Sequence, residues 1–250
     1  MRSIADIRTA GLLGAALLAA LPAAIALPAP GAEAAPPPRI TSMVVGKDRV
    51  LGGVRTVTAA PATLRVGGRR CAVPAGTALS VLLARGSAIK VADYGRCGPR
   101  AVDSTGLYVT QIGPDRRGGP AGWVYKVGRR VATTGAADPS GPFGTGRRLQ
   151  ADQPLLWFWC RSAGRCQRTL EIGAPARVRA DQAFTITVRG YDDQGRGRAI
   201  AGASLRVGAE TFTTDERGRA TVRATAPGTL TLRASKEGLV EAFPRTVAVR

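Results

Sequence analysis

The segment from Gly122 to Cys166 constrains the fold most, because it holds all three tryptophans and two of the four cysteines. It contains Leu155–Cys160, six consecutive apolar residues, which is a typical strand length. Alternate residues of a strand point to opposite faces, and here both faces are apolar. The pattern predicts a central strand that is covered on both sides, or a strand with one side reserved for a ligand.

Residues 1–35 have the features of a secretory signal. A basic start precedes an apolar run from Gly11 to Leu27, and Ala32-Glu33-Ala34 is a small-x-small cleavage site. The alternative is a retained membrane anchor, which the short run and its internal Pro22 disfavour. No later segment is apolar for long enough to span a bilayer. We therefore expect a protein that is secreted or associated with the cell envelope.

Four cysteines in an extracytoplasmic chain predict two disulfides. Cys160 and Cys166 enclose five residues, as in a short hairpin, so we expect them to pair and to leave Cys71 for Cys97. A zinc site is the rival interpretation. It is disfavoured because the chain has no histidine and no C-x-x-C spacing. We expect no metal site and no cofactor.

The formal net charge is +19, and most of it lies in residues 36–172, which carry 21 basic and seven acidic side chains. Arginine accounts for 32 of the 36 basic residues of the chain. This excess fits a biased genome composition, but it also fits attraction to an anionic cell-envelope polymer or glycan. The paired arginines support the second interpretation: Arg69-Arg70, Arg116-Arg117, Arg129-Arg130 and Arg147-Arg148. No pair extends into a basic arm, so nucleic acid is not the expected partner.

After a proline-rich spacer at residues 36–39, the chain predicts an α+β domain over residues 40–172. Thr77 is a helix cap, and three leucines follow at i, i+3 and i+4, namely Leu79, Leu82 and Leu83. Gly86 suits the end of this helix, which is too short to be stable unless it packs on a sheet. We expect Gln167–Ile172 to return as the antiparallel partner of Leu155–Cys160.

Residues 173–250 predict a second domain, because tryptophan and cysteine disappear and short alternating segments recur between turns. This spacing is typical of a small immunoglobulin-like β-sandwich. The expected strands are 184–189, 203–207, 210–213, 219–225, 229–234 and 245–250. The predicted fold class is therefore mainly β with two domains, an α+β module and then a sandwich.

The first domain resembles a family of secreted domains of unknown function related to the C-terminal domain of transcobalamin. The matching segments are Gly76–Leu79, Gly122–Tyr125 and Leu155–Phe158. The second domain resembles bacterial immunoglobulin-like repeats through the segments 188–192, 200–203 and 214–220. The first resemblance raises the alternative of a corrinoid-like small-ligand carrier. The second implies a spacer or adhesion module.

The aromatic residues of the first domain are the candidate ligand surface. They are Trp123, Tyr125, Trp157 and Trp159, and the alternative is that they form the core of a domain with few other large side chains.

No catalytic residue is predicted, since the chain lacks histidine and a G-x-S-x-G elbow. Five aspartates leave open a carboxylate-dependent carbohydrate-active enzyme, although their neighbours are typical of turns: Asp93, Asp103, Asp115, Asp138 and Asp152. Asp192-Asp193 and Asp215-Glu216 lack the ligand spacing of a calcium loop. The preferred hypothesis is a non-enzymatic binding module.

Overall fold

The computed structural model describes residues 35–250, so the predicted signal lies outside the described residues apart from Ala35. In the described range no helix is long and apolar enough to cross a membrane. Residues 36–38 of the predicted spacer have no regular structure. The first strand, β1 (Arg39–Val45), begins one residue before the predicted start of the first domain at residue 40. The contacts of residues 36–250 hold them together as one unit.

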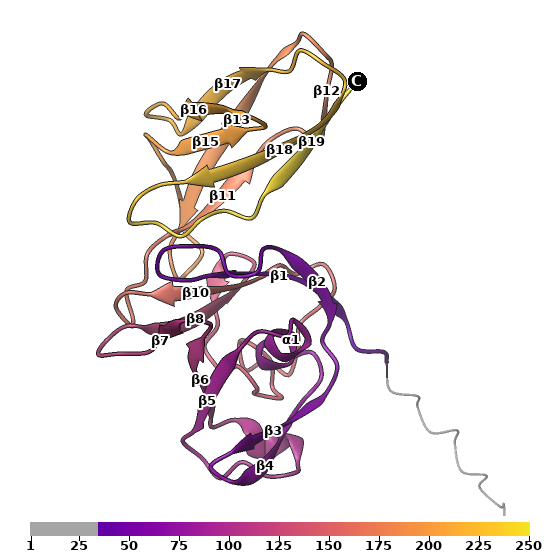
Figure 1. Ribbon diagram of the computed structural model, residues 1–250, viewed down its shortest axis with the longest axis vertical. Coiled ribbons are helices and arrows are strands. Elements are labelled where there is room, and N and C mark those ends of the chain that lie inside the picture. The colour runs from indigo at the N-terminus through magenta and orange to yellow at the C-terminus, as the bar shows by residue number, and fades with distance from the viewer. Residues whose placement is uncertain (1–34) are drawn as a thin grey trace, which may run out of the picture. The chain divides into compact units, whose positions relative to one another are not determined.

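The apolar strand β10 (Leu155–Cys160) is the centre of a five-stranded sheet in the order β2-β1-β10-β8-β9 (Figure 1). The other members are β2 (Arg55–Thr58), β8 (Gly122–Val127) and β9 (Arg130–Val131). β1 pairs with β10 in parallel, and β8 pairs with it antiparallel along its whole length. All six residues of β10 are buried, so the prediction of a central, doubly covered strand is confirmed.

The two faces of β10 pack on different parts of the chain. One face, Leu155, Trp157 and Trp159, belongs to the core that contains helix α1 (Ala78–Ala84). The other face, Leu156, Phe158 and Cys160, belongs to a second cluster that includes Val240 and Phe243 from the C-terminal sandwich. The protein itself therefore covers both faces.

Helix α1 begins as the sequence predicts. Thr77 is its N-cap: Ser80 N donates to Thr77 Oγ1 at 3.3 Å, and Thr77 N donates to Ser80 Oγ at 3.2 Å. Leu79 and Leu82 are fully buried against the sheet. Gly86 follows the C-cap with a φ of +67°, a conformation that residues with a Cβ rarely adopt.

Two small sheets complete the first region. β3 (Ala62–Val66) and β4 (Arg69–Val73) form a hairpin, and β5 (Ile89–Asp93), β6 (Leu107–Ile112) and β7 (Asp115–Arg116) form a second sheet. A 3-10 helix (Ala101–Ser104) lies between β5 and β6. The Cys71–Cys97 disulfide ties β4 to the loop after β5, and Cys160–Cys166 closes the loop after β10.

The C-terminal region is a sandwich of two sheets. The first contains β11 (Thr169–Gly173), β13 (Ala183–Tyr191), β14 (Gly197–Ala199) and β17 (Arg219–Arg223). The second has the order β12 (Arg177–Val178), β19 (Arg245–Val249), β18 (Gly228–Ser235), β15 (Ser204–Val207) and β16 (Glu210–Thr213). Alternate side chains from both sheets meet in one core: Ile186, Val188, Leu205, Leu232 and Val247.

One predicted pairing is wrong. Residues 167–172 do not return beside β10; instead β11 pairs antiparallel with β13 of the sandwich. The reason is physical, because both edges of β10 are already occupied by β1 and β8. Leu170 and Ile172 alternate into the core of the sandwich. The predicted domain boundary at residue 173 therefore falls inside β11.

Candidate functional site

The four predicted aromatic residues are buried and do not form an exposed platform. Trp123, Tyr125, Trp157 and Trp159 are 3%, 7%, 2% and 6% exposed. They form two cross-strand pairs between β8 and β10. The Trp123 and Trp159 rings meet edge to face at 5.6 Å, and the Tyr125 and Trp157 rings are tilted at 5.0 Å. Such pairs stabilise the core of the sheet.

Three of these aromatic residues also line a small cavity, which we call the indole cavity. It has a volume of about 160 Å³ and lies between Trp123, Tyr125 and Trp157 on the sheet and Leu107 and Val109 of β6. The Tyr125 hydroxyl is 3.3 Å from the carbonyl oxygens of residues 134 and 135. Burial raises the pKa of Tyr125 to about 12, so its hydroxyl stays protonated at neutral pH.

The exposed aromatic residue of this region is Tyr94, which the sequence analysis passed over. Its side chain is 69% exposed and meets Tyr108 edge to face at 5.9 Å. Arg117 donates to the Tyr94 hydroxyl at 2.6 Å and lies 5.2 Å from the centre of the Tyr108 ring. The alternation of β5 could have indicated that Tyr94 faces solvent, since the residue follows directly on an alternating strand.

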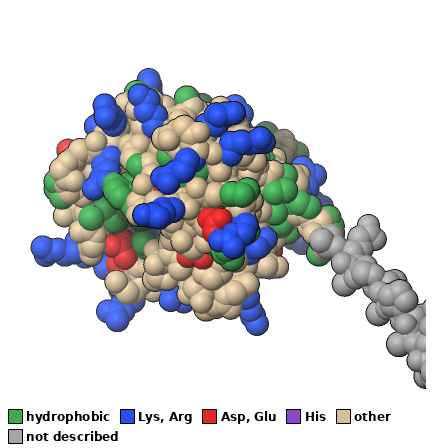
Figure 2. Space-filling view, turned by 90° about the horizontal axis from the view of Figure 1, so that it is seen from below, with side chains coloured by type: hydrophobic (Ala, Val, Ile, Leu, Met, Phe, Trp, Pro, Cys, Tyr) green, Lys and Arg blue, Asp and Glu red, His purple; other side chains and the backbone are tan. Residues whose placement is uncertain are grey.

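A second cavity lies beside the β3–β4 hairpin. Arg65 of β3 and Arg70 of β4 are directly opposite each other, so their exposed side chains lie on the same face. Next to them is an open hollow of about 560 Å³ lined by Thr63, Arg69, Arg70, Ala72 and the loop at residues 97–99. We call this surface the arginine face. Figure 2 shows basic side chains spread over the molecule on the side seen from below, with few acidic ones.

The acidic residues near the arginine face are already engaged. Asp93 accepts from Arg69 at 3.2 Å and also from the backbone N–H groups of residues 95 and 97. Asp103 pairs with Arg100 at 2.9 Å, and the hydrogen bonds from that guanidinium hold the pKa of the carboxyl below its usual value. Among residues 35–250, no carboxylate forms an ion pair with Arg65 or Arg70.

Four of the five aspartates of the hydrolase alternative accept hydrogen bonds within the described chain. Besides Asp93 and Asp103, Asp115 accepts from the N–H of residue 47, and Asp138 accepts from the backbone and hydroxyl of Ser140. The contacts of Asp138, and those of Asp93 with residues 95 and 97, are local as the turn interpretation predicts, whereas the contact of Asp115 is long-range.

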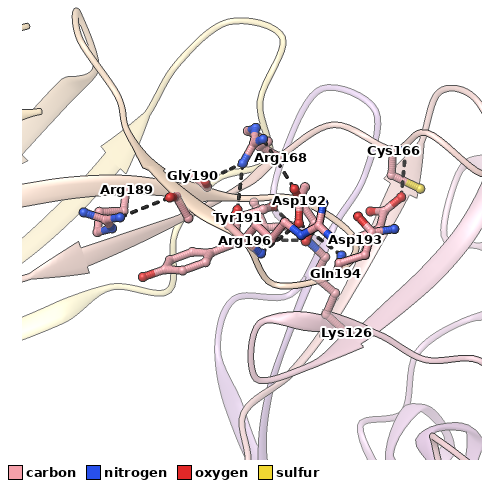
Figure 3. Close-up of polar contacts among 12 residues, drawn as sticks. Lys126, Cys166, Arg168, Arg189, Gly190, Tyr191, Asp192, Asp193, Gln194 and Arg196 are labelled. Carbon is pink, nitrogen blue, oxygen red and sulfur yellow. Dashed lines mark hydrogen bonds and ion pairs between the residues drawn. The ribbon is translucent and has the colours of Figure 1, made fainter.

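A buried cation joins the two regions of the chain, and the sequence analysis missed it. Lys126 of β8 has an exposed fraction of 0%, and its ammonium group donates to three acceptors. These are Thr169 Oγ1 at 3.1 Å, the carbonyl of Tyr191 at 2.9 Å and the carbonyl of Asp192 at 2.8 Å. Figure 3 labels Tyr191 and Asp192 beside Lys126. An ammonium group has three N–H donors, so its hydrogen bonds are complete.

The pKa of Lys126 is lowered to about 8, mainly because burial penalises the charged form. The nearby carboxylates of Asp193 and Asp192 oppose this effect. Lys126 therefore still carries its charge at neutral pH. A charged residue within an otherwise apolar strand is the sequence signal that could have identified it, because such a residue needs a buried partner.

The ammonium group of Lys126 contacts the end of β13 and the start of the loop at residues 192–196, and we call this contact region, with Cys166 and Arg168 beside it, the junction (Figure 3). Arg168 donates to the carbonyls of residues 190 and 196 and pairs with Asp192. Asp193 Oδ2 accepts from the N–H of Cys166 at 3.2 Å. Asp192 and Asp193 thus bind groups of the protein, and among the described residues no cluster of three possible metal ligands exists.

Arg129 adds an ion pair at the rim of the junction. Its guanidinium donates to both oxygens of Glu171, at 2.8 and 2.6 Å, and lies 4.4 Å from the centre of the Tyr191 ring. Hydrogen bonding to that carboxylate raises the pKa of Arg129. Half of each side chain is exposed, so this pair contributes little to stability compared with Lys126.

Arg85 is a second buried cation that the sequence did not reveal. It lies at the end of α1, is 4% exposed, and donates to the carbonyls of Ser42 at 2.7 Å and Gly53 at 2.9 Å. Burial, with a smaller effect of Arg55, lowers its pKa to about 10. Its contacts fasten the helix to β1 and the following loop, which is a structural role.

Comparisons with known proteins give fold-level likeness only. No protein-family model and no curated protein matches the chain. The solved structures that resemble part of it include the CARDB domain of a Pyrococcus furiosus protein in a crystal structure with di-metal ions, the same domain in solution, and the fibronectin(III)-like modules of Clostridium thermocellum CbhA.

The similarity to these structures is low. Identities are 16%, 15% and 14%, the matches cover 34%, 33% and 51% of this chain and 88%, 94% and 75% of the others, and the TM-scores are 0.23, 0.24 and 0.26. At these scores the likeness carries no argument about function. The resemblance to the transcobalamin-related family stays a prediction.

Proposed function

We propose that this protein is a non-enzymatic extracytoplasmic module that binds an anionic glycan of the cell envelope through its arginine face. The observation that carries the proposal is the pairing of Arg65 with Arg70 beside an open hollow, without a carboxylate partner among residues 35–250. Like charges directly opposite on paired strands are destabilising. A bound anion between them would turn this repulsion into attraction.

The chemistry of the guanidinium group supports a ligand with phosphate, sulfate or carboxylate groups. Arginine presents a planar fork of donors that matches such groups in a bidentate geometry. Arg70 lines the hollow itself, and Arg65 lies opposite it on the same face. A repeating anionic polymer fits this open surface better than a small enclosed anion would.

The two disulfides support an oxidising compartment, which agrees with the predicted signal. The structural hydrogen bonds of four of the five aspartates support a binding module over a hydrolase. An extracytoplasmic location places the arginine face within reach of envelope polymers.

The test compares two variants with the same loss of charge. R65A/R70A removes the arginine face, and R206A/R233A removes another pair of directly opposed, exposed arginines on β15 and β18. Binding to immobilised polygalacturonate and dextran sulfate is measured against salt concentration, with neutral dextran as the blank. We expect R65A/R70A to weaken binding about tenfold and R206A/R233A about twofold or less.

Two results would contradict the proposal. Equal losses in the two variants would mean that net charge, and not this face, attracts the polymer. Release of reducing ends from polygalacturonate by the unmodified protein would contradict the non-enzymatic part, and Asp→Asn changes would then locate the carboxylates responsible.

A further inference from the structure

Tyr94 is an exposed aromatic residue on a fixed loop. It is 69% exposed, more than any other large apolar or aromatic residue within residues 35–250. Its N–H donates to the carbonyl of Gly106 at 2.9 Å, and the carboxylate of the preceding Asp93 accepts from the N–H groups of residues 95 and 97. The disulfide from Cys97 to β4 holds the same loop. The backbone that presents the ring to solvent is therefore already ordered, which lowers the entropy lost when a ligand binds.

Two neighbours fix the ring itself. Tyr108 of β6 meets it edge to face at 5.9 Å, and Nη1 of Arg117 donates to the Tyr94 hydroxyl at 2.6 Å. The Arg117 guanidinium lies 5.2 Å from the centre of the Tyr108 ring. We call Tyr94, Tyr108 and Arg117 the tyrosine platform. Tyrosine offers a large and rigid contact area at a low cost in entropy, and binding surfaces are enriched in it.

Arg117 keeps the edge of its guanidinium that binds carboxylates. The residue is exposed, and none of the ion pairs of residues 35–250 involves it. Its bond to Tyr94 uses Nη1, which leaves Nε and Nη2 as a fork for a bidentate partner. Other arginines of this protein bind carboxylates with the same two atoms, namely Arg100 with Asp103 and Arg129 with Glu171.

These two features together indicate the kind of ligand that fits. One face of a sugar ring presents C–H groups, and these are attracted to the electron-rich face of an aromatic ring. A carboxylate on the same sugar would pair with the arginine fork beside the ring. A uronic acid has both parts in one residue. A neutral sugar offers the ring alone, and polyphosphate offers the charge alone.

We infer that the tyrosine platform binds one uronic acid residue of an anionic glycan, with its sugar ring on Tyr94 and its carboxylate on Arg117. This inference rests on the proposed glycan binding and names the class of sugar that the protein selects. The arginine face attracts a polyanion of any kind, whereas the platform prefers a sugar acid. Tyr108 is a positioning residue, because it supports both the Tyr94 ring and Arg117.

The experiment uses the full chain and three probes. They are the trimer of α-1,4-linked galacturonic acid, the corresponding neutral trimer of galactose, and polyphosphate, which is anionic but has no ring. Isothermal titration calorimetry at one salt concentration measures the dissociation constants. We expect the galacturonic acid trimer to bind about tenfold more tightly than the neutral trimer, because only the acid forms the charged pair with Arg117.

Variants of Tyr94 test the ring. Y94A should weaken binding of the galacturonic acid trimer about tenfold and change binding of polyphosphate by about twofold or less. Y94F keeps the ring and loses only the hydroxyl, so it should weaken trimer binding by about threefold or less. V102A is the control, since Val102 of the 3-10 helix is 62% exposed and apolar. All three variants should fold, as judged by circular dichroism, because both side chains are mostly exposed.

Arg117 and Arg116 provide a second comparison with the same loss of charge. Both are exposed and neither pairs with a carboxylate of residues 35–250, but only Arg117 is bonded to Tyr94. R117A should weaken binding of the galacturonic acid trimer about tenfold, and R116A about twofold or less.

Three results would overturn the inference. They are equal affinity for the acidic and the neutral trimer, equal effects of Y94A and V102A, and equal effects of R117A and R116A. Measuring R65A/R70A with the same probes separates this inference from the proposed function. Weaker polyphosphate binding in R65A/R70A, with Y94A unchanged for the trimer, would keep the arginine face and reject the platform. Weaker trimer binding in Y94A and R117A, with no change in R65A/R70A for any probe, would keep the platform and reject the arginine face.

Discussion

The arginine face and the junction both contain cations, but the surroundings of these cations differ. At the junction, Lys126 is fully buried and all three of its N–H groups have acceptors. At the arginine face, Arg65 and Arg70 are exposed, opposed to each other and without a carboxylate partner in residues 35–250. The difference teaches that the hydrogen bonds of Lys126 hold the two regions of the chain together, whereas an unsatisfied exposed pair beside an open hollow is available for a ligand.

The largest expected effect is the loss of the junction cation. K126M would leave the carbonyls of Tyr191 and Asp192 without their donor and remove the charge that faces Asp193. Each buried carbonyl that loses its donor destabilises the fold by about 1–3 kcal/mol, which gives about 2–6 kcal/mol for the two. Equilibrium unfolding in guanidinium chloride measures the loss. The exposed Lys90 provides the control, since K90M should change stability by less than about 0.5 kcal/mol.

A loss below about 1 kcal/mol in K126M would show that the junction is held by its apolar cluster alone. The difference between the junction and the arginine face would then disappear, because a buried and an exposed cation would contribute equally to the free energy of unfolding.

The next effect compares the disulfides of the two regions. Cys71–Cys97 lies beside the arginine face with a sequence separation of 26, and Cys160–Cys166 lies at the junction with a separation of 6. In the loop-entropy model their removal destabilises by about 3.5 and about 2.5 kcal/mol. Unfolding of C71A/C97A and C160A/C166A measures both. The opposite order would indicate that the short loop is fixed mainly by the junction contacts of Cys166.

Much of the local structure was predictable because it depends on neighbouring residues. The cap at Thr77, the leucine stripe of α1 and six sandwich strands follow from patterns within a few positions. The pairing of Cys71 with Cys97 followed once loop length had assigned the other two cysteines.

The long-range pairings were not predictable in the same way. No local pattern shows that β1 lies parallel to β10, because its partner is more than a hundred residues away in sequence. Once both edges of β10 are occupied, β11 has to pair elsewhere. The junction could not be foreseen for the same reason, since Lys126 and the loop at residues 192–196 meet only in the folded chain.

The pH dependence of the free energy of unfolding gives a second test of the buried Lys126 at the junction. The pKa of Lys126 is about 8 in the folded protein, below the usual value of 10.5. Between these values the unfolded chain binds more protons than the folded one, so stability rises with pH. From pH 7 to 9.5 the gain should be about 2 kcal/mol. Tyr125 and Arg85 contribute mainly above this range, because their folded pKa values are about 12 and about 10.

The measurement is the free energy of unfolding at several pH values for the unmodified protein and for K126M. The rise should be absent in K126M. A rise of equal size in both proteins would assign it to other groups and contradict the burial penalty at Lys126.

The smallest effect on stability is expected at the arginine face, and its sign is the informative part. Removing Arg65 and Arg70 together relieves the repulsion between two opposed like charges, which is worth about 0.2–1 kcal/mol. R65A/R70A should therefore be slightly more stable than the unmodified protein while it binds polygalacturonate more weakly. A stabilising change that lowers binding identifies residues that are kept for a ligand and not for the fold. A destabilisation of more than about 0.5 kcal/mol would place these arginines, like Lys126, among the groups that hold the structure together.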